Sequence, residues 1–144
     1  EGGDGAPTRT AAAAGPGEIR DRYREAFNLL KEARYDEAVT AFEDFLSRHP
    51  DSSYSDNAQY WLGESYYVTR RFDQAVAQFQ KVLDEYPDSA KVPDAMLKIG
   101  YVRYEQQSWD DARAMLKSLH EQHPDTTAAR LAEQRLQRIK LEGH

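Results

Sequence analysis

The sequence contains no cysteine, only two methionines and no long apolar run. The missing cysteines exclude disulfide bonds and thiolate metal sites. A membrane-spanning helix needs roughly 20 apolar residues in succession, so no direct membrane insertion is expected. The net charge is -6 at pH 7, and basic residues are interleaved with acidic ones instead of forming a basic stripe. Nucleic acid favours such a stripe, so it is not an expected partner.

Catalytic motifs are also lacking. There is no Gly-rich phosphate loop, no GxSxG and no HExxH. His120 and His123 stand three residues apart near the expected end of a helix, a spacing that can hold a metal but is more typical of solvated partners of the helix dipole. The sequence therefore predicts a protein that is not an enzyme and uses no cofactor and no metal.

Composition divides the chain into three parts. Residues 1–17, EGGDGAPTRTAAAAGPG, are rich in Gly, Ala and Pro and have no apolar periodicity, so they are predicted to be a flexible linker. Residues 18–141 are predicted to form one folded domain. Residues 142–144 are assigned to a tail, for which a vector origin is one explanation.

Residues 18–141 contain an internal repeat with a step of 37 residues. Pro50, Pro87 and Pro124 follow one another at this step. The same step links four further sets, which are Ala38, Ala75 and Ala112; Phe42, Phe79 and Leu116; Tyr35, Phe72 and Trp109; and Ala26, Gly63 and Gly100. So many positions in register identify a repeat architecture.

Each repeat is predicted to be a helical hairpin. Ser52, Ser89 and Thr126 each follow a Pro-Asp pair and suit an N-cap, so a first helix of about 16 residues is expected after each. Second helices are expected to begin near Tyr35, Phe72 and Trp109 and to end before the repeat's proline. This arrangement gives three hairpins and a last helix, from about residue 126 to 141, that caps the stack.

The repeat resembles the tetratricopeptide pattern. The resemblance is carried by Leu62, Gly63, Tyr66, Phe72, Ala75, Phe79 and Pro87, and again by Ile99, Gly100, Trp109, Ala112, Leu116 and Pro124. It implies an all-α superhelix in which Gly63 and Gly100 let paired helices approach closely. The usual unit has 34 residues, and the extra turn is expected at the start of each first helix. The turn between helices usually carries Gly, whereas Ala33, Arg70 and Gln107 stand there.

A narrower resemblance covers residues 21–136. The phrases NAQYWLGE, YPDSAKVPDAMLKIG and YREAFNLLKEARYDEA are similar to the C-terminal domain of the YbgF (CpoB) family of Tol-Pal system proteins. The resemblance implies a periplasmic interaction module that binds TolA, and through it a bifunctional penicillin-binding protein, to coordinate outer-membrane constriction with septal peptidoglycan synthesis. In that family trimerisation belongs to an N-terminal coiled coil, which this chain lacks, so trimerisation is not expected of it.

The first helices are expected to share one lattice of side chains on a concave face. The arithmetic of 100° per residue places Tyr60 and Tyr67 opposite Leu62, away from the hairpin core. Projected through the 37-residue step, this face is formed by nine residues, which are Tyr23, Phe27, Leu30, Tyr60, Glu64, Tyr67, Leu97, Tyr101 and Tyr104. A ring-rich face with one central carboxylate favours a docking groove for a peptide or helix, and packing between neighbouring first helices is the alternative.

Two other functions fit the pattern. One is an outer-membrane assembly scaffold of the BamD kind, which has similar repeats. The other is a periplasmic holding chaperone, which would bind many unfolded clients where an adaptor binds one folded partner.

Overall fold

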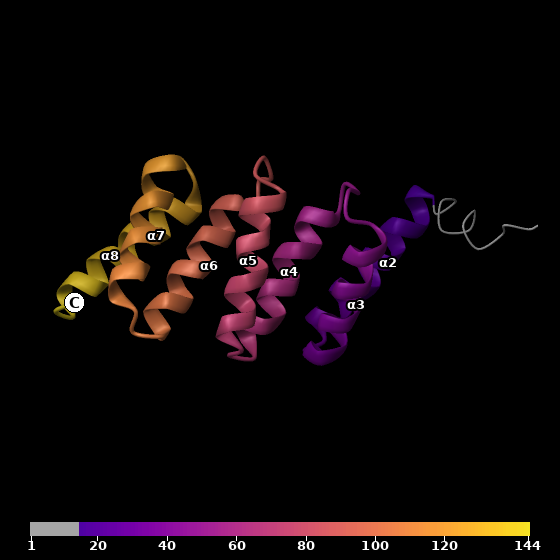
Figure 1. Cartoon of the computed structure of the whole chain (residues 1–144), viewed down its shortest axis with the longest axis horizontal. Helices are drawn as coiled ribbons and strands as arrows, with labels where there is room; N and C mark the ends of the chain where they lie inside the picture. Colours follow the sequence, from indigo (N-terminus) through magenta and orange to yellow (C-terminus); the bar gives the residue numbers. More distant parts are fainter. Residues whose placement is uncertain (1–14) are drawn as a thin grey trace, which may run out of the picture.

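The structure, a computed structural model, describes residues 15–144. This part of the chain folds into seven α-helices. The helices are α2 (Pro16–Lys31), α3 (Tyr35–Arg48), α4 (Ser55–Val68), α5 (Phe72–Glu85), α6 (Val92–Glu105), α7 (Trp109–Gln122) and α8 (Thr127–Leu141). The helices pair as three hairpins, α2 with α3, α4 with α5 and α6 with α7. The hairpins stack side by side, with α2 at one end of the stack and α8 at the other (Figure 1). The predicted all-α superhelix of three hairpins and a capping helix is confirmed.

The second helices begin where the repeat predicts. Tyr35, Phe72 and Trp109 are the first residues of α3, α5 and α7. The Thr126 hydroxyl accepts a hydrogen bond of 3.0 Å from the N–H of Ala129, so this predicted N-cap is confirmed.

The other two predicted caps are wrong. The hydroxyls of Ser52 and Ser89 accept bonds from the N–H groups of Tyr54 and Lys91, two residues on, and so stabilise a turn. The α-helices begin three residues after each serine, at Ser55 and Val92, and have 14 residues. With a three-residue turn inside the hairpin, a 34-residue unit would leave three residues for this connection, whereas residues 86–91 provide six. The extra residues therefore lengthen the loop and not the helix.

The turns inside the hairpins adopt a left-handed backbone. Ala33, Arg70 and Gln107 have φ of 62°, 60° and 59°. Each lies where the tetratricopeptide pattern usually has Gly, and the backbone keeps the left-handed conformation without it. An L-residue with a Cβ pays a steric penalty in this region, so all three hairpins carry a local cost in the same turn.

The hairpin core forms where a small residue meets a large one. A methyl group added to Gly63 would lie 2.7 Å from ring atoms of Phe79, and one added to Gly100 would lie 2.5 Å from Leu116. Phe79 and Leu116 are fully buried. The first helices therefore contact the second helices through backbone, as the resemblance implies, except that Ala26 fills this place in the first hairpin.

The helical part of the chain begins earlier than the predicted residue 18, and its last helix ends at Leu141. Helix α2 begins at Pro16, inside the predicted linker 1–17, because proline has no N–H to lose at the first helical position. Residues 1–14 lie outside the described residues. In the predicted tail, the ring of His144 stacks on Trp109 with 3.7 Å between centroids, and the Tyr104 hydroxyl donates to Glu142. Glu142 and His144 therefore contact the last hairpin, although both are exposed.

Replacing Ala33 with Gly should stabilise the protein. Gly adopts a φ of 62° without the steric penalty, so the free energy of unfolding should rise by about 1 kcal/mol in urea denaturation. Ala77→Gly is the matched control, since Ala77 is exposed inside helix α5, where Gly costs about 1 kcal/mol. Destabilisation by both substitutions would contradict the account of the turn.

Replacing Gly63 with Ala should destabilise the protein although Ala is the better helix former. The added methyl would meet the Phe79 ring, and overpacking of this kind costs about 1–3 kcal/mol. The control is Ala26→Gly at the equivalent position, where a buried methyl group is already accommodated and its removal should also destabilise. An unchanged unfolding midpoint for Gly63→Ala would show that the helices do not need this close approach.

Candidate protein-binding surfaces

The nine residues predicted to form a docking groove occupy α2, α4 and α6, but they differ in burial. Tyr60 and Leu97 are each only 6% exposed and belong to the hydrophobic core. The other seven are half-buried, namely Tyr23, Phe27, Leu30, Glu64, Tyr67, Tyr101 and Tyr104. The structure therefore places Tyr60 and Leu97 in the core and leaves the other seven side chains partly exposed.

The first row, Tyr23, Tyr60 and Leu97, packs inward. The ring of Tyr60 lies 5.4 Å from that of Phe79, and the ring of Tyr23 lies 6.4 Å from that of Phe42. The expectation that Tyr60 is not needed for the hairpin core is therefore wrong. Helical side chains lean toward the N-terminus of their helix, so a wheel angle alone misplaces a long ring near the start of α4.

Outside the first row, six half-buried side chains remain, which we call the first-helix face, namely Phe27, Leu30, Glu64, Tyr67, Tyr101 and Tyr104. Several of its aromatic rings have the cationic group of a Lys or Arg side chain packed over them. The Lys98 ammonium lies 4.5 Å from the centroid of Tyr67, and the Arg135 guanidinium lies 4.2 Å from that of Tyr101. Such contacts contribute about 0.5–1 kcal/mol at exposed sites. They also leave the face both aromatic and polar, which is typical of protein-binding surfaces.

Glu64 provides the carboxylate at the centre of this face. Its Oε1 atom lies 3.2 Å from the Nζ of Lys98, and both side chains are largely buried. Burial raises the pKa of the Tyr67 hydroxyl, and the neighbouring carboxylates of Glu64 and Glu105 raise it further. Tyr67 is therefore a neutral hydrogen-bond donor at physiological pH, available beside an ion pair.

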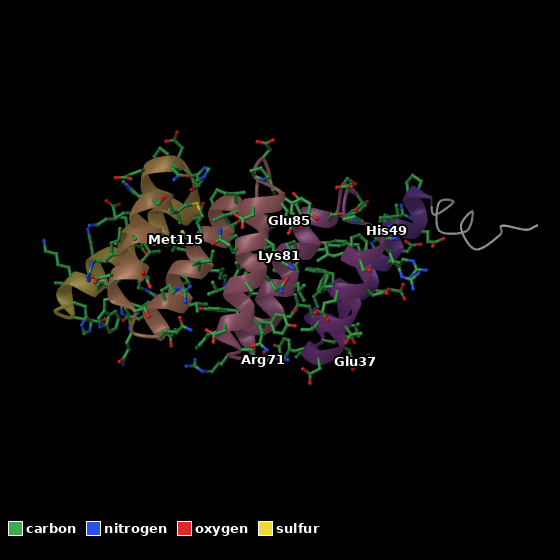
Figure 2. All side chains as sticks on the ribbon, viewed as in Figure 1. Glu37, His49, Arg71, Lys81, Glu85 and Met115 are labelled. Atoms are coloured by element: carbon green, nitrogen blue, oxygen red, sulfur yellow. The ribbon has the colours of Figure 1, made fainter. Side chains whose placement is uncertain are left out.

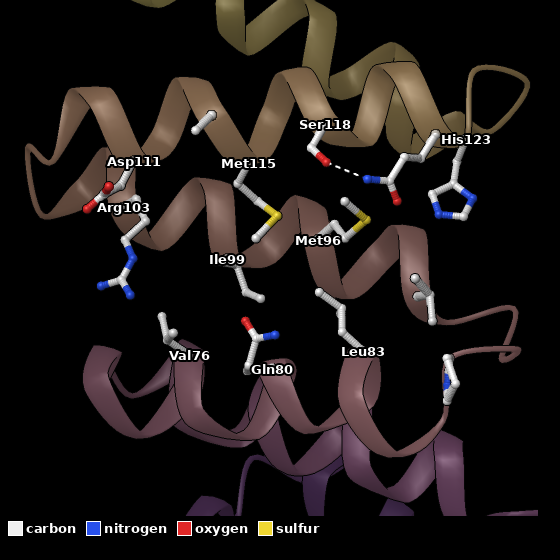
Figure 3. Close-up of a pocket in the computed structure, with 14 residues that line it drawn as sticks. Val76, Gln80, Leu83, Met96, Ile99, Arg103, Asp111, Met115, Ser118 and His123 are labelled. Carbon is white, nitrogen blue, oxygen red and sulfur yellow. Dashed lines mark hydrogen bonds between the residues drawn. The ribbon is translucent and has the colours of Figure 1, made fainter.

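A second candidate surface lies on the other layer of the stack, between α5 and α7. It is a cavity of about 690 Å³ with α6 as its floor (Figure 3). Its apolar lining includes Val76, Leu83, Val92, Met96, Ile99 and Met115, and its polar lining consists of Gln80, Arg103, Asp111, Ser118, Gln122 and His123. Both methionines of the chain lie here. We call this cavity the α5–α7 groove.

The common pattern of the repeats does not predict this groove. The equivalent space between α3 and α5 is smaller, about 290 Å³. There the Gln59 amide donates to the side-chain oxygen of Gln78 at 2.8 Å, and the Tyr86 hydroxyl donates to the carbonyl of Pro50 at 2.7 Å. A comparison of Gln59, Gln78 and Tyr86 with the residues 37 positions later would have given the signal, because those residues are Met96, Met115 and His123.

Other kinds of site are not found in residues 15–144. No group of three or more His, Asp or Glu side chains is placed to hold a metal ion there. His120 lies beside Glu133, with 4.0 Å between Nε2 and Oε2. Within the same residues, no helix has both the length and the apolar character needed to cross a membrane.

Comparisons with known proteins agree with this geometry. Two family models, each described as a tetratricopeptide repeat, match residues 23–90 and 71–136. The translocator chaperone SycD of the Yersinia enterocolitica type III secretion system has a similar solved structure, with a TM-score of 0.72 over 89% of this chain and 87% of SycD. Its sequence is 17% identical, so this likeness shows the fold alone.

Curated relatives are similar over a shorter stretch. The cell division coordinator CpoB of Pseudomonas putida is 41% identical over 58 residues, and that of Escherichia coli is 40% identical over 62 residues. Each match covers 40% of this chain and only 22% or 24% of the relative. The chain therefore matches less than a quarter of the length of these relatives.

Tyr60 and Tyr67 should differ sharply when each is replaced by Ala. Loss of the buried Tyr60 ring should lower the free energy of unfolding by about 3–5 kcal/mol. The half-buried Tyr67 should cost about 1–2 kcal/mol, because it loses less buried area. Urea denaturation followed by circular dichroism measures both. Equal losses would show that the two rings share one environment.

Proposed function

Because the chain belongs to the tetratricopeptide repeat family, we propose that it is a protein-binding domain of the periplasmic Tol-Pal system and that TolA is its partner. Through TolA it acts on a bifunctional penicillin-binding protein and coordinates outer-membrane constriction with septal peptidoglycan synthesis. The observation that carries this proposal is the identity of 40–41% to the cell division coordinator CpoB. The domain itself works by binding and performs no catalysis.

The first-helix face is the surface we assign to this binding. Its side chains are half-buried, so their remaining area is available to a partner at a small further entropic cost. Tyr67 and Tyr101 provide rigid rings, which commonly dominate the binding energy of an interface. Tyr60 and Leu97 support the face from below instead of touching the partner, because they are buried.

Helical hairpins suit this role because they present a preformed surface. Each hairpin contacts its neighbours only, and the face grows by one row of side chains with each repeat. A partner segment that lies across α4 and α6 meets Tyr67, Glu64 and Tyr101 in one continuous strip. The Glu64–Lys98 pair at its centre adds specificity more than affinity, because both charges are already paired.

Binding of the purified periplasmic part of TolA tests the proposal. Replacing Tyr67 and Tyr101 together with Ala should weaken binding at least about tenfold, equivalent to 1.4 kcal/mol, as measured by isothermal titration calorimetry. Circular dichroism verifies that the variant is folded. Met115→Gln, on the other layer of the stack, is the control and should bind as the parent does. Undiminished binding by the tyrosine variant would exclude this face, and no binding by the parent chain would exclude TolA.

A further inference from the structure

The α5–α7 groove and its counterpart between α3 and α5 are built from the same repeat positions with different residues. Two glutamines bridge α4 and α5 in the first groove, since the Gln59 amide donates to both the backbone and the side-chain oxygen of Gln78. In the second groove Met96 and Met115 stand at these positions and form no such bridge (Figure 3). The second groove is therefore the larger one because two methionines replace the two glutamines that bridge the first groove.

Three charged positions of the first groove also differ from their equivalents in the second groove. Glu43, Lys81 and Glu85 line the first groove. The residues 37 positions later, which line the second groove, are the uncharged Gln80, Ser118 and Gln122. Lys81 and Glu85 lie on α5, and Met115 lies on α7 (Figure 2). These three positions are uncharged in the second groove, whose charged lining residues are Arg103 and Asp111.

The charged residues of the α5–α7 groove stand near one end of it. Arg103 and Asp111 lie there, on α6 and at the first turn of α7. The Arg103 guanidinium donates to the Gln106 side chain at 3.0 Å, and within residues 15–144 neither Arg103 nor Asp111 forms an ion pair. A segment that fills the groove therefore meets charge at this end and, along the rest, apolar side chains together with the polar Gln80, Ser118, Gln122 and His123.

The shape of the groove selects a helix. Val76, Gln80 and Leu83 form a stripe along α5, and Met115, Ser118 and Gln122 form the facing stripe along α7. Both helices have 14 residues, which corresponds to about 21 Å. Two such parallel ridges accept the side chains of a third helix between them. Methionine side chains adapt to the shape of an incoming apolar residue.

We propose that the α5–α7 groove binds the apolar face of an amphipathic helix from a partner protein, with the charged residues of that helix at the Arg103 and Asp111 end. This site is separate from the first-helix face, so it goes beyond the proposed function. The volume of the groove is about 690 Å³. The proposed partner helix is uncharged for about three turns along the buried face.

A synthetic probe tests the groove directly. The probe is a fluorescein-labelled peptide of about 16 residues made of Ala and Gln, with Leu every three to four positions and one Glu at its C-terminal end. A scrambled peptide, with the leucines spread around the helix, is its control. Fluorescence anisotropy of the full chain should show saturable binding of the probe and at least about tenfold weaker binding of the scrambled peptide.

The two methionines report the location of binding. After labelling of the methionine methyl groups with carbon-13, the chain should give one signal each for Met96 and Met115, and both should shift when the probe binds. Signals that do not move would place the probe elsewhere and overturn the proposal. Shifts that appear on raising the protein concentration without the probe would show that a second copy of the chain covers the groove, which would also overturn it.

Substitutions copied from the first groove test the chemistry. Met96→Gln with Met115→Gln should close the groove and weaken probe binding at least about tenfold. Met96→Leu with Met115→Leu keeps the lining apolar and should retain binding, so this second variant separates polarity from a loss of folding. Tyr67→Ala, on the first-helix face, should leave probe binding unchanged. Equal binding by the glutamine and leucine variants would overturn the proposal, whatever the outcome with TolA.

Discussion

The close approach of the two helices in each hairpin is the constraint on which the rest of the structure depends. Gly63 leaves room for the Phe79 ring, and Gly100 leaves room for Leu116. Once Phe79 occupies this space, Tyr60 packs against its ring instead of projecting outward. The outer face of α4 therefore begins one turn later, at Glu64. A single small residue, Gly63, thus determines the distance between the two helices of the hairpin and the first position on α4 that a partner can contact.

Much of this architecture is readable in the sequence because it repeats. The 37-residue step predicts the number of hairpins, the first residues of α3, α5 and α7, and the capping helix. The start of α4 was predicted wrongly because a serine hydroxyl that accepts an N–H looks the same in sequence whether it caps a helix or a turn. Only Thr126 caps a helix, whereas Ser52 and Ser89 stabilise the longer loops.

The candidate surfaces were predicted less completely than the fold. Helical periodicity identifies the six side chains of the first-helix face, but it gives only a direction around an axis and not the lean of a side chain, so Tyr60 was misplaced. Helical periodicity does not predict the α5–α7 groove. It joins two helices that are not neighbours along the chain, and it exists because Met96 and Met115 differ from their counterparts in the preceding repeat. Differences between repeats, rather than their common pattern, indicate this kind of site.

Helix α6 contributes to both surfaces from opposite sides. Tyr101 belongs to the first-helix face, whereas Ile99 and Arg103, two residues away in either direction, line the α5–α7 groove. Gly100 lies between them and holds α6 against Leu116. Because the backbone of α6 is fixed by this contact, a partner on one side has little freedom to shift the side chains on the other. The two surfaces are therefore expected to bind independently, and any coupling between them has to pass through the position of this one helix.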